Sequence, residues 1–373
     1  MLRDDLVREG QHAMTVCNAC RYCEGYCPVF QAMEDRLTFS PGDLAYLGNL
    51  CHNCGECLYA CQYAPPHEFA INVPRTLSAI GVASYEACCW PSFVASAFRK
   101  QRLPTMLGVV MSAIVALGAT VVAWRPDIVT RSDWRGDFYS VIPHPAMVAL
   151  FMAAGLFAVG ALAVACGRFV RETGFTTAGS SRPAADGSRA RFRFPALSAL
   201  GDALTLRHLH GTGADCTDSL ETRRPWRRWF HHCTMYGFML CFASTSVAAI
   251  YHLVFGWPAP YGYTSLPVTL GTAGGIGLLI GPAGLFALRR TRDKALTDPA
   301  QSRLDTGFLL MLFLTSLTGL LLLVFRNGPA MPALLVVHLG VVLALFVMLP
   351  YGKFVHGIYR TVALVKFAFE KSD

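Results

Sequence analysis

Long apolar segments without charged side chains constrain the fold of this chain more than any other feature. Residues 104–124 contain no Asp, Glu, Lys or Arg, and about 20 such residues are enough to cross the hydrocarbon layer of a membrane as a helix. Only 15% of all residues are charged, whereas soluble proteins average roughly 25%. Six transmembrane helices are therefore predicted, at about 104–124, 145–167, 229–254, 266–288, 305–325 and 332–355.

Positive charges lie between the predicted helices and set their expected orientation. The connection 171–228 holds ten Arg, whereas residues 256–266 hold no charged side chain. Because positively charged loops stay in the cytoplasm, this connection, the 289–304 loop and both termini are predicted to be cytoplasmic, in a bacterial inner membrane. The net charge of +8 could suggest nucleic-acid binding. Arg clusters between apolar segments are instead typical of membrane proteins, so no nucleic-acid partner is expected.

Two cysteine runs near the N-terminus predict iron–sulfur clusters. Eight of the 14 cysteines fall within residues 17–61, in two runs that share the spacing C-x2-C-x2-C-x3-C. Two-residue gaps let three thiolates wrap one [4Fe–4S] cluster, while the fourth cysteine of each run reaches the other cluster. The predicted ligand sets are Cys17, Cys20, Cys23 and Cys61 for the first cluster, and Cys51, Cys54, Cys57 and Cys27 for the second. Proline follows the first run at Pro28, and Gln62 replaces it after the second.

Zinc and disulfide bonds are the alternatives for these cysteines. Structural zinc sites usually use two separated ligand pairs, which two consecutive quartets fit poorly. Residues 1–21 carry several charges and no apolar core, so they are not expected to be a secretory signal peptide. The cysteines are then expected in the cytoplasm, where disulfides are rare. Cys88 and Cys89 have no companion run, and we interpret them as ordinary thiols.

These features predict a mainly α-helical protein of two parts. Residues 1–90 are expected to form a ferredoxin-like domain with two [4Fe–4S] clusters, in which Ser40 marks the start of a helix. Residues 91–103 are the predicted linker, and residues 104–373 the six-span transmembrane electron-transfer domain. Glycines of the fourth span, Gly281 among them, are expected to let helix backbones approach closely.

Histidines near the ends of the predicted spans are candidate haem ligands. The apolar interiors of the six spans hold no Asp, Glu, Lys or Arg, and neutral imidazole is a common axial ligand of haem. The candidates are His144, His231, His232, His252, His338 and His356. The alternative is that some of them only anchor helix ends at the membrane surface. His208 and His210, with Cys216, lie in the polar connection and are expected to be solvated.

The order of the spans suggests how these histidines pair. Since the third and sixth spans run antiparallel, His231 and His232 are expected level with His356, and His252 level with His338. The step from His338 to His356 is about five turns of a 3.6-residue helix, so both are expected on one face. The same phase argument favours His231 over His232, although Pro350 in the sixth span weakens it. His144 is a competing ligand at the far membrane face.

The cysteine runs, joined to a histidine-bearing membrane domain, resemble the citrate/tricarballylate utilization protein B family. The stretches that carry the resemblance are CQYAPPHEFAINVP at residues 61–74, RRWFHH at 227–232, and Tyr251 with His252. The membrane half is also similar in layout to the haem b subunit of respiratory nitrate reductases. The resemblance implies an electron-transfer protein that reoxidises the reduced flavin of a soluble tricarballylate dehydrogenase and delivers electrons to the membrane quinone pool.

The predicted function therefore combines two [4Fe–4S] clusters, one or two haems b and a quinone acceptor, with an FAD-containing dehydrogenase as partner. Whether the chain itself is an enzyme stays open, because it is expected to be one component of an oxidoreductase system. One alternative is a quinone-linked subunit of another flavoprotein dehydrogenase or of a heterodisulfide-reductase-type complex. The others are a redox sensor and a tricarboxylate carrier. A carrier is disfavoured because a trianion path would need Arg or Lys inside the spans.

Overall fold

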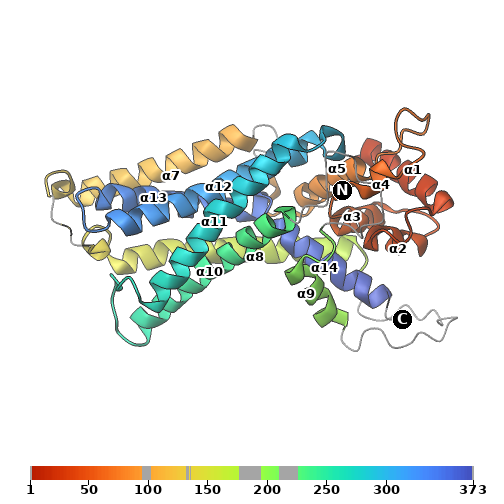
Figure 1. Ribbon diagram of the computed structural model, residues 1–373. Helices are drawn as coiled ribbons and strands as arrows, with labels where there is room; N and C mark the ends of the chain where they lie inside the picture. Colours follow the sequence, from red (N-terminus) through yellow and green to blue (C-terminus); the bar gives the residue numbers. More distant parts are fainter. Residues whose placement is uncertain are drawn as a thin grey trace.

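The computed structural model describes residues 2–94, 102–131, 134, 136–175, 195–209 and 226–371. His210 and Cys216 lie outside the described residues, as do most of the predicted linker and much of the 171–228 connection. The described residues form helices and turns and contain no strand, which confirms the mainly α-helical fold class. Figure 1 shows a long helical bundle with the N-terminal domain at one end. The first helix, α1 (Asp4–Cys20), and the last, α14 (Val355–Glu370), both lie at that end.

Five helices build the N-terminal domain around an apolar core. They are α1, α2 (Pro28–Glu34), α3 (Pro41–Leu50), α4 (Glu56–Tyr59) and α5 (Val73–Cys88). Met14, Leu47 and Leu77 are fully buried where α1, α3 and α5 pack together. The predicted helix start at Ser40 is confirmed, since its Oγ accepts a hydrogen bond from the Asp43 backbone N–H at 3.1 Å. The Asp43 carboxylate in turn accepts one from the Ser40 N–H at 3.0 Å, which completes a capping box.

Six helices of the bundle are long and apolar enough to cross a membrane, as predicted. They are α7 (Arg102–Trp124), α8 (His144–Glu172), α10 (Trp226–Leu253), α11 (Leu266–Thr291), α12 (Pro299–Phe325) and α13 (Met331–Met348). The connection from α7 to α8 contains 3-10 turns at Pro126–Val129 and Phe138–Ser140, and the connection from α11 to α12 contains one at Lys294–Leu296. Many large apolar side chains on the outer faces are exposed, Leu156 at 66% for example, which suits a surface that contacts lipid.

The predicted close packing of the fourth span is confirmed where α11 meets α10. A Cβ atom added to Gly281 of α11 would lie only 2.4 Å from Oγ1 of Thr234 on α10. A Cβ added to Gly274 would lie 2.8 Å from the Cys241 backbone nitrogen. Such small-residue contacts let transmembrane helices associate without a large apolar driving force.

The sixth predicted span, 332–355, is not one continuous helix. α13 ends at Met348, a 3-10 turn, η4, covers Leu349–Tyr351, and α14 begins at Val355. Pro350 explains the break, because proline lacks the N–H of the helical ladder and its ring clashes with the preceding turn. His338 and His356 therefore lie on different helices, and the five-turn argument for a shared face does not hold.

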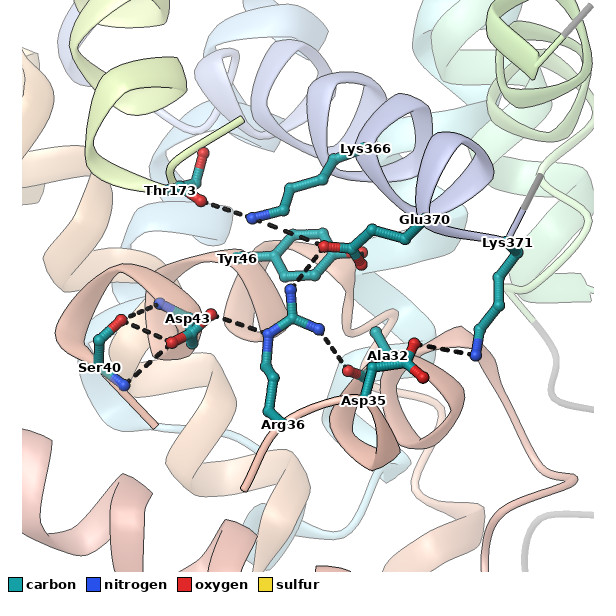
Figure 2. A network of polar contacts seen from close by, with 10 residues as sticks. All are labelled: Ala32, Asp35, Arg36, Ser40, Asp43, Tyr46, Thr173, Lys366, Glu370 and Lys371. Atoms are coloured by element: carbon teal, nitrogen blue, oxygen red, sulfur yellow. Dashed lines mark hydrogen bonds and ion pairs between the residues drawn. The ribbon is translucent and has the colours of Figure 1, made fainter. Parts of the chain in front are cut away.

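α14 leaves the bundle and packs against the N-terminal domain and against α9 (Pro195–Thr205). A polar network centred on Arg36 holds this interface (Figure 2). Arg36 pairs with Asp43 at 2.8 Å and with Glu370 of α14 at 2.6 Å. The Tyr46 hydroxyl donates to the same Glu370 carboxylate at 3.0 Å. Two carboxylates thus compensate the Arg36 charge, and the two halves of the protein are joined by partly buried ion pairs.

Candidate iron–sulfur and histidine sites

The C-terminal end of α1 and the turn after α4 bring together the first predicted cysteine set. α1 ends at Cys20 because Arg21 adopts a left-handed conformation, with φ of 55°. The chain then turns back, so that a cavity of about 280 Å³ is lined by Cys17, Cys20, Cys23 and Cys61, together with Cys57. The lining residues all fall between Val16 and Val73, within the N-terminal domain.

The second predicted set gathers around the end of α3. Cys51 follows α3, Cys27 precedes α2, and Cys54 and Cys57 lie on either side of the α4 start. All four line a narrower cavity of about 20 Å³, which His208 also lines. Cys57 borders both cavities and so lies between the two sets. The two cavities therefore divide the eight cysteines as the crossed ligand assignment requires, apart from this shared residue.

The donor set fits iron–sulfur clusters, because each cavity is lined by at least four cysteines and thiolates are the ligands of such clusters. The described cysteines are also all free thiols, with no disulfide between them. Burial, followed by the charge of Cys61, raises the pKa of Cys17 to about 12, so a bound metal would be needed to keep it as a thiolate.

Gln62 and Asn53 donate hydrogen bonds to cysteine sulfur atoms, and the Asn53 side chain also holds the loop between Cys51 and Cys54. The Gln62 amide, which stands where the first run has proline, donates to Cys20 Sγ at 3.9 Å. The Asn53 backbone N–H donates to Cys51 Sγ at 3.4 Å. Asn53 has a φ of 51° and its side chain donates to the carbonyls of Pro74 and Leu296, at 3.1 and 2.8 Å. Asn tolerates this left-handed conformation better than most residues, so the loop between Cys51 and Cys54 is anchored to both halves of the protein.

His231 of α10 and His356 of α14 come together at the end of the bundle nearest the N-terminal domain. Their ring centroids are 6.1 Å apart. His356 Nδ1 lies 2.5 Å from the Lys353 carbonyl oxygen, which would leave Nε2 available, and such a backbone contact is common for metal-binding histidines. His231 Nδ1 is buried and has no hydrogen-bond partner within the described part of the chain. His232 faces Tyr236 instead, with centroids 5.5 Å apart.

A second histidine pair lies at the far end of the bundle. His144 of α8 and His252 of α10 stack with ring centroids 3.6 Å apart, next to Tyr139. His252 Nδ1 has no partner among the described residues. His338 lies instead against α12, where its Nδ1 is 3.0 Å from Thr318 Oγ1. The structure thus places His252 against His144, the competing candidate, rather than against His338.

Cys88 and Cys89 lie outside the two cysteine sets. Both are buried free thiols, and Cys88 Sγ donates to Glu172 at 3.2 Å. His208, expected to be solvated, lines the cavity of the second set and lies against His52 with ring centroids 5.7 Å apart. Its Nε2 lies 3.6 Å from Oδ2 of Asp202. This contact could not be predicted, because His208 belongs to a polar connection far from residue 52.

Comparison with known proteins gives the family. Residues 10–87 match the Citrate utilization protein B Fer4-like domain, and residues 99–373 match the family described as Citrate utilization protein B. The chain is 45% identical over 368 residues to Citrate utilization protein B of Escherichia coli, which covers 97% of this chain and 92% of that protein. This chain belongs to the citrate utilization protein B family. No solved structure matches it.

For a citrate utilization protein B, the Fer4-like half indicates an iron–sulfur electron-transfer role, and the six long apolar helices indicate a membrane location. The two cysteine sets of this family member fall inside the Fer4-like match, and all six candidate histidines fall inside the second match. Asn53 and three arginines, Arg227, Arg292 and Arg360, hold the 51–54 loop, and these contacts were not predicted from the sequence. Arginines at the ends of the spans indicated membrane orientation, and Arg227 also belongs to the RRWFHH stretch that carries the family resemblance.

Proposed function

We propose that this protein reoxidises the reduced flavin of a soluble dehydrogenase and passes the electrons through two [4Fe–4S] clusters and haem b to membrane quinone. The observation that carries the proposal is the position of the second cysteine set. Its loop lies against the ends of bundle helices that also hold His231 and His356. A donor domain and a candidate haem site are thus neighbours in one chain.

The eight cysteines would hold the clusters in the crossed arrangement, with Cys17, Cys20, Cys23 and Cys61 on one and Cys27, Cys51, Cys54 and Cys57 on the other. Bound clusters would supply one-electron carriers. The protein's own task is to bury these thiols, to donate N–H groups to sulfur from Gln62 and Asn53, and to fix the domain on the bundle. Oxidation of an organic acid is a two-electron reaction, so the flavin is expected on a partner chain.

His231 and His356 would hold one haem, and His144 and His252 a second. The support is that each pair joins two helices and includes a buried imidazole nitrogen without a protein partner in the described residues. The two pairs lie near opposite ends of the bundle helices, which is where carriers that conduct electrons across a membrane would be needed. Both termini would face the cytoplasm, as the Arg distribution suggests.

The partner is proposed to be a dehydrogenase of a tricarboxylate such as tricarballylate. Its support is the family resemblance and the name of the Escherichia coli relative, which refers to citrate utilization. A flavoprotein dehydrogenase acting on another substrate would use the same electron path.

The proposal is tested by mixing the reduced flavoprotein with membranes that contain this protein while haem absorbance and quinone reduction are followed together. Flavin oxidation coupled to both signals is expected. Purified protein without iron and acid-labile sulfide would refute the cluster assignment. Protein without a b-type spectrum on dithionite reduction would remove the haem step. If this protein oxidises only a flavoprotein dehydrogenase that acts on another substrate, the electron path is retained and only the proposed partner changes.

A further inference from the structure

Three arginines, one on α10, one on α14 and one directly after α11, donate hydrogen bonds to the loop that carries Cys51 and Cys54. Arg227 of α10 donates to the carbonyls of Asn53 and His52, at 2.9 and 3.1 Å. Arg360 of α14 donates to the Cys51 carbonyl at 2.6 Å and to the Asn49 carbonyl at 3.3 Å. Arg292, directly after α11, also donates to the Asn53 carbonyl. The positive ends of three side chains thus meet at one cysteine loop.

The positive charges of these arginines lie beside the second cysteine set and not beside the first. The cavity of the first set is lined by residues of the N-terminal domain, and Tyr22 at its rim is 64% exposed. Arg21, next to that set, is exposed as well, so water and salt screen its charge. The second set lies where the N-terminal domain meets the bundle, and its arginines are partly buried. Their charges act through a medium that screens them less.

The same arginines connect the loop to the candidate haem pair. Arg227 precedes His231 by one helical turn on α10, and Arg360 follows His356 by one turn on α14. Residues four apart lie on the same face of a helix. On α10 and on α14, an arginine therefore contacts the cysteine loop, and a histidine one turn away belongs to the His231–His356 pair.

We propose that Arg227, Arg292 and Arg360 raise the reduction potential of the cluster held by Cys27, Cys51, Cys54 and Cys57 above that of the other cluster. This inference rests on the proposed function. Reduction of a cluster adds one electron and therefore one negative charge, which nearby positive charges stabilise. The first set, whose cavity is lined only by residues of the N-terminal domain, receives an electron from the partner's reduced flavin, and the second set holds it next to the bundle. The arginines are positioning residues that make electron transfer toward the membrane favourable.

The test is a potentiometric titration of the cluster-loaded, full-length protein, followed by electron paramagnetic resonance. Arg227→Gln, Arg292→Gln and Arg360→Gln keep hydrogen-bond donors but remove the charge. In each variant, the ratio of reduced to oxidised cluster at a fixed potential is expected to fall about tenfold for the cluster of the second set and to stay unchanged for the other. A tenfold change corresponds to a midpoint shift of about 59 mV for a one-electron couple. The corresponding Lys variants are expected to keep both midpoints. Cys54→Ser and Cys20→Ser identify which midpoint belongs to which cysteine set.

Arg36→Gln is the matched control. Arg36 also joins the N-terminal domain to α14, but its hydrogen bonds go to Ala32, Asp43 and Glu370 rather than to a cysteine loop, so neither midpoint should move. Unchanged midpoints in the three Gln variants, equal shifts of both midpoints, or Lys variants that behave like the Gln variants would each overturn the proposal. If one Gln variant loses its iron, the midpoint potentials of the other two Gln variants and of the Lys variants still test the proposal. Wild-type protein without iron would refute the proposed function instead.

Discussion

The His231 and His356 rings meet edge to face with their centroids 6.1 Å apart, although one belongs to a membrane helix and the other to a helix beyond the break at Pro350. Only His231 of the two adjacent histidines takes part, because His232 points toward Tyr236. The pair therefore links the bundle to the C-terminal helix that docks on the cysteine-bearing domain.

His231→Leu and His356→Leu are each expected to abolish the same haem signal, because either change would remove one of the two residues proposed to hold that haem. The measurement is the reduced-minus-oxidised spectrum together with haem content per protein. His232→Leu is the matched control and should keep the full signal. A normal spectrum in His356→Leu would exclude that residue as a ligand.

A second haem is proposed between His144 and His252, whose rings stack with centroids 3.6 Å apart and would have to separate to admit it. Replacing His252 or His144 by Leu should lower haem content by about half while the signal that depends on His231 persists, since each pair would hold one haem. His338→Leu should keep both haems, because His338 lies against Thr318 of α12. If instead His338→Leu removes a haem and His144→Leu does not, the pairing first expected from the sequence is correct.

Docking of the N-terminal domain should depend on pH through Asp43. Burial raises the pKa of this carboxyl, but hydrogen bonds from Ser40 and Arg36 outweigh it and leave the pKa below its ordinary value. The carboxylate therefore stabilises the folded state above about pH 4, and this contribution is lost as pH falls through the lowered pKa. Thermal unfolding of wild type and Asp43→Asn from pH 7 to 3 should show a stability difference that disappears in acid.

Asp35→Asn provides the control for that comparison. Asp35 forms a 3.0 Å ion pair with Lys371, and its side chain is 45% exposed, so the pair is expected to contribute at most about 1 kcal/mol. A pH-independent difference between wild type and Asp43→Asn would show that Asp43 acts through packing rather than through its charge.

Close contact between α10 and α11 predicts a strong effect of side-chain size. Gly281→Leu should lower the free energy of unfolding by roughly 1–3 kcal/mol, the usual cost of overpacking, because even a Cβ would lie 2.4 Å from Thr234 Oγ1. Gly160→Leu on α8 has open space around its Cβ and should be tolerated. Denaturant unfolding in detergent measures both, and equal stability of the two variants would contradict the packing described.

The sequence was most informative where one physical constraint decides the outcome. Charge-free apolar segments predicted the six long helices, since helices satisfy backbone hydrogen bonds in lipid. The cysteine spacing predicted two groups, and the structure gathers them around two cavities. The histidine pairs were predicted only in part. Helical phase favours His231 over His232, and His231 is the one that lies against His356. The phase argument for His338 and His356 fails because the chain breaks at Pro350, and His338 as a haem ligand stays a prediction.

The contacts between the two halves could not be predicted because they join residues far apart in the chain. Arg36 and Glu370 are separated by 334 positions, and Asn53 reaches the carbonyl of Leu296. No local pattern marks either residue, since a single arginine or asparagine in a polar stretch is usually solvated.

The break at Pro350 has a consequence for how the protein is assembled during synthesis. The helix α14, which carries Arg360 and Glu370, follows all the long apolar helices in the chain. The contacts that it makes with the Cys51 loop and with Arg36 can therefore form only after those helices have been synthesised.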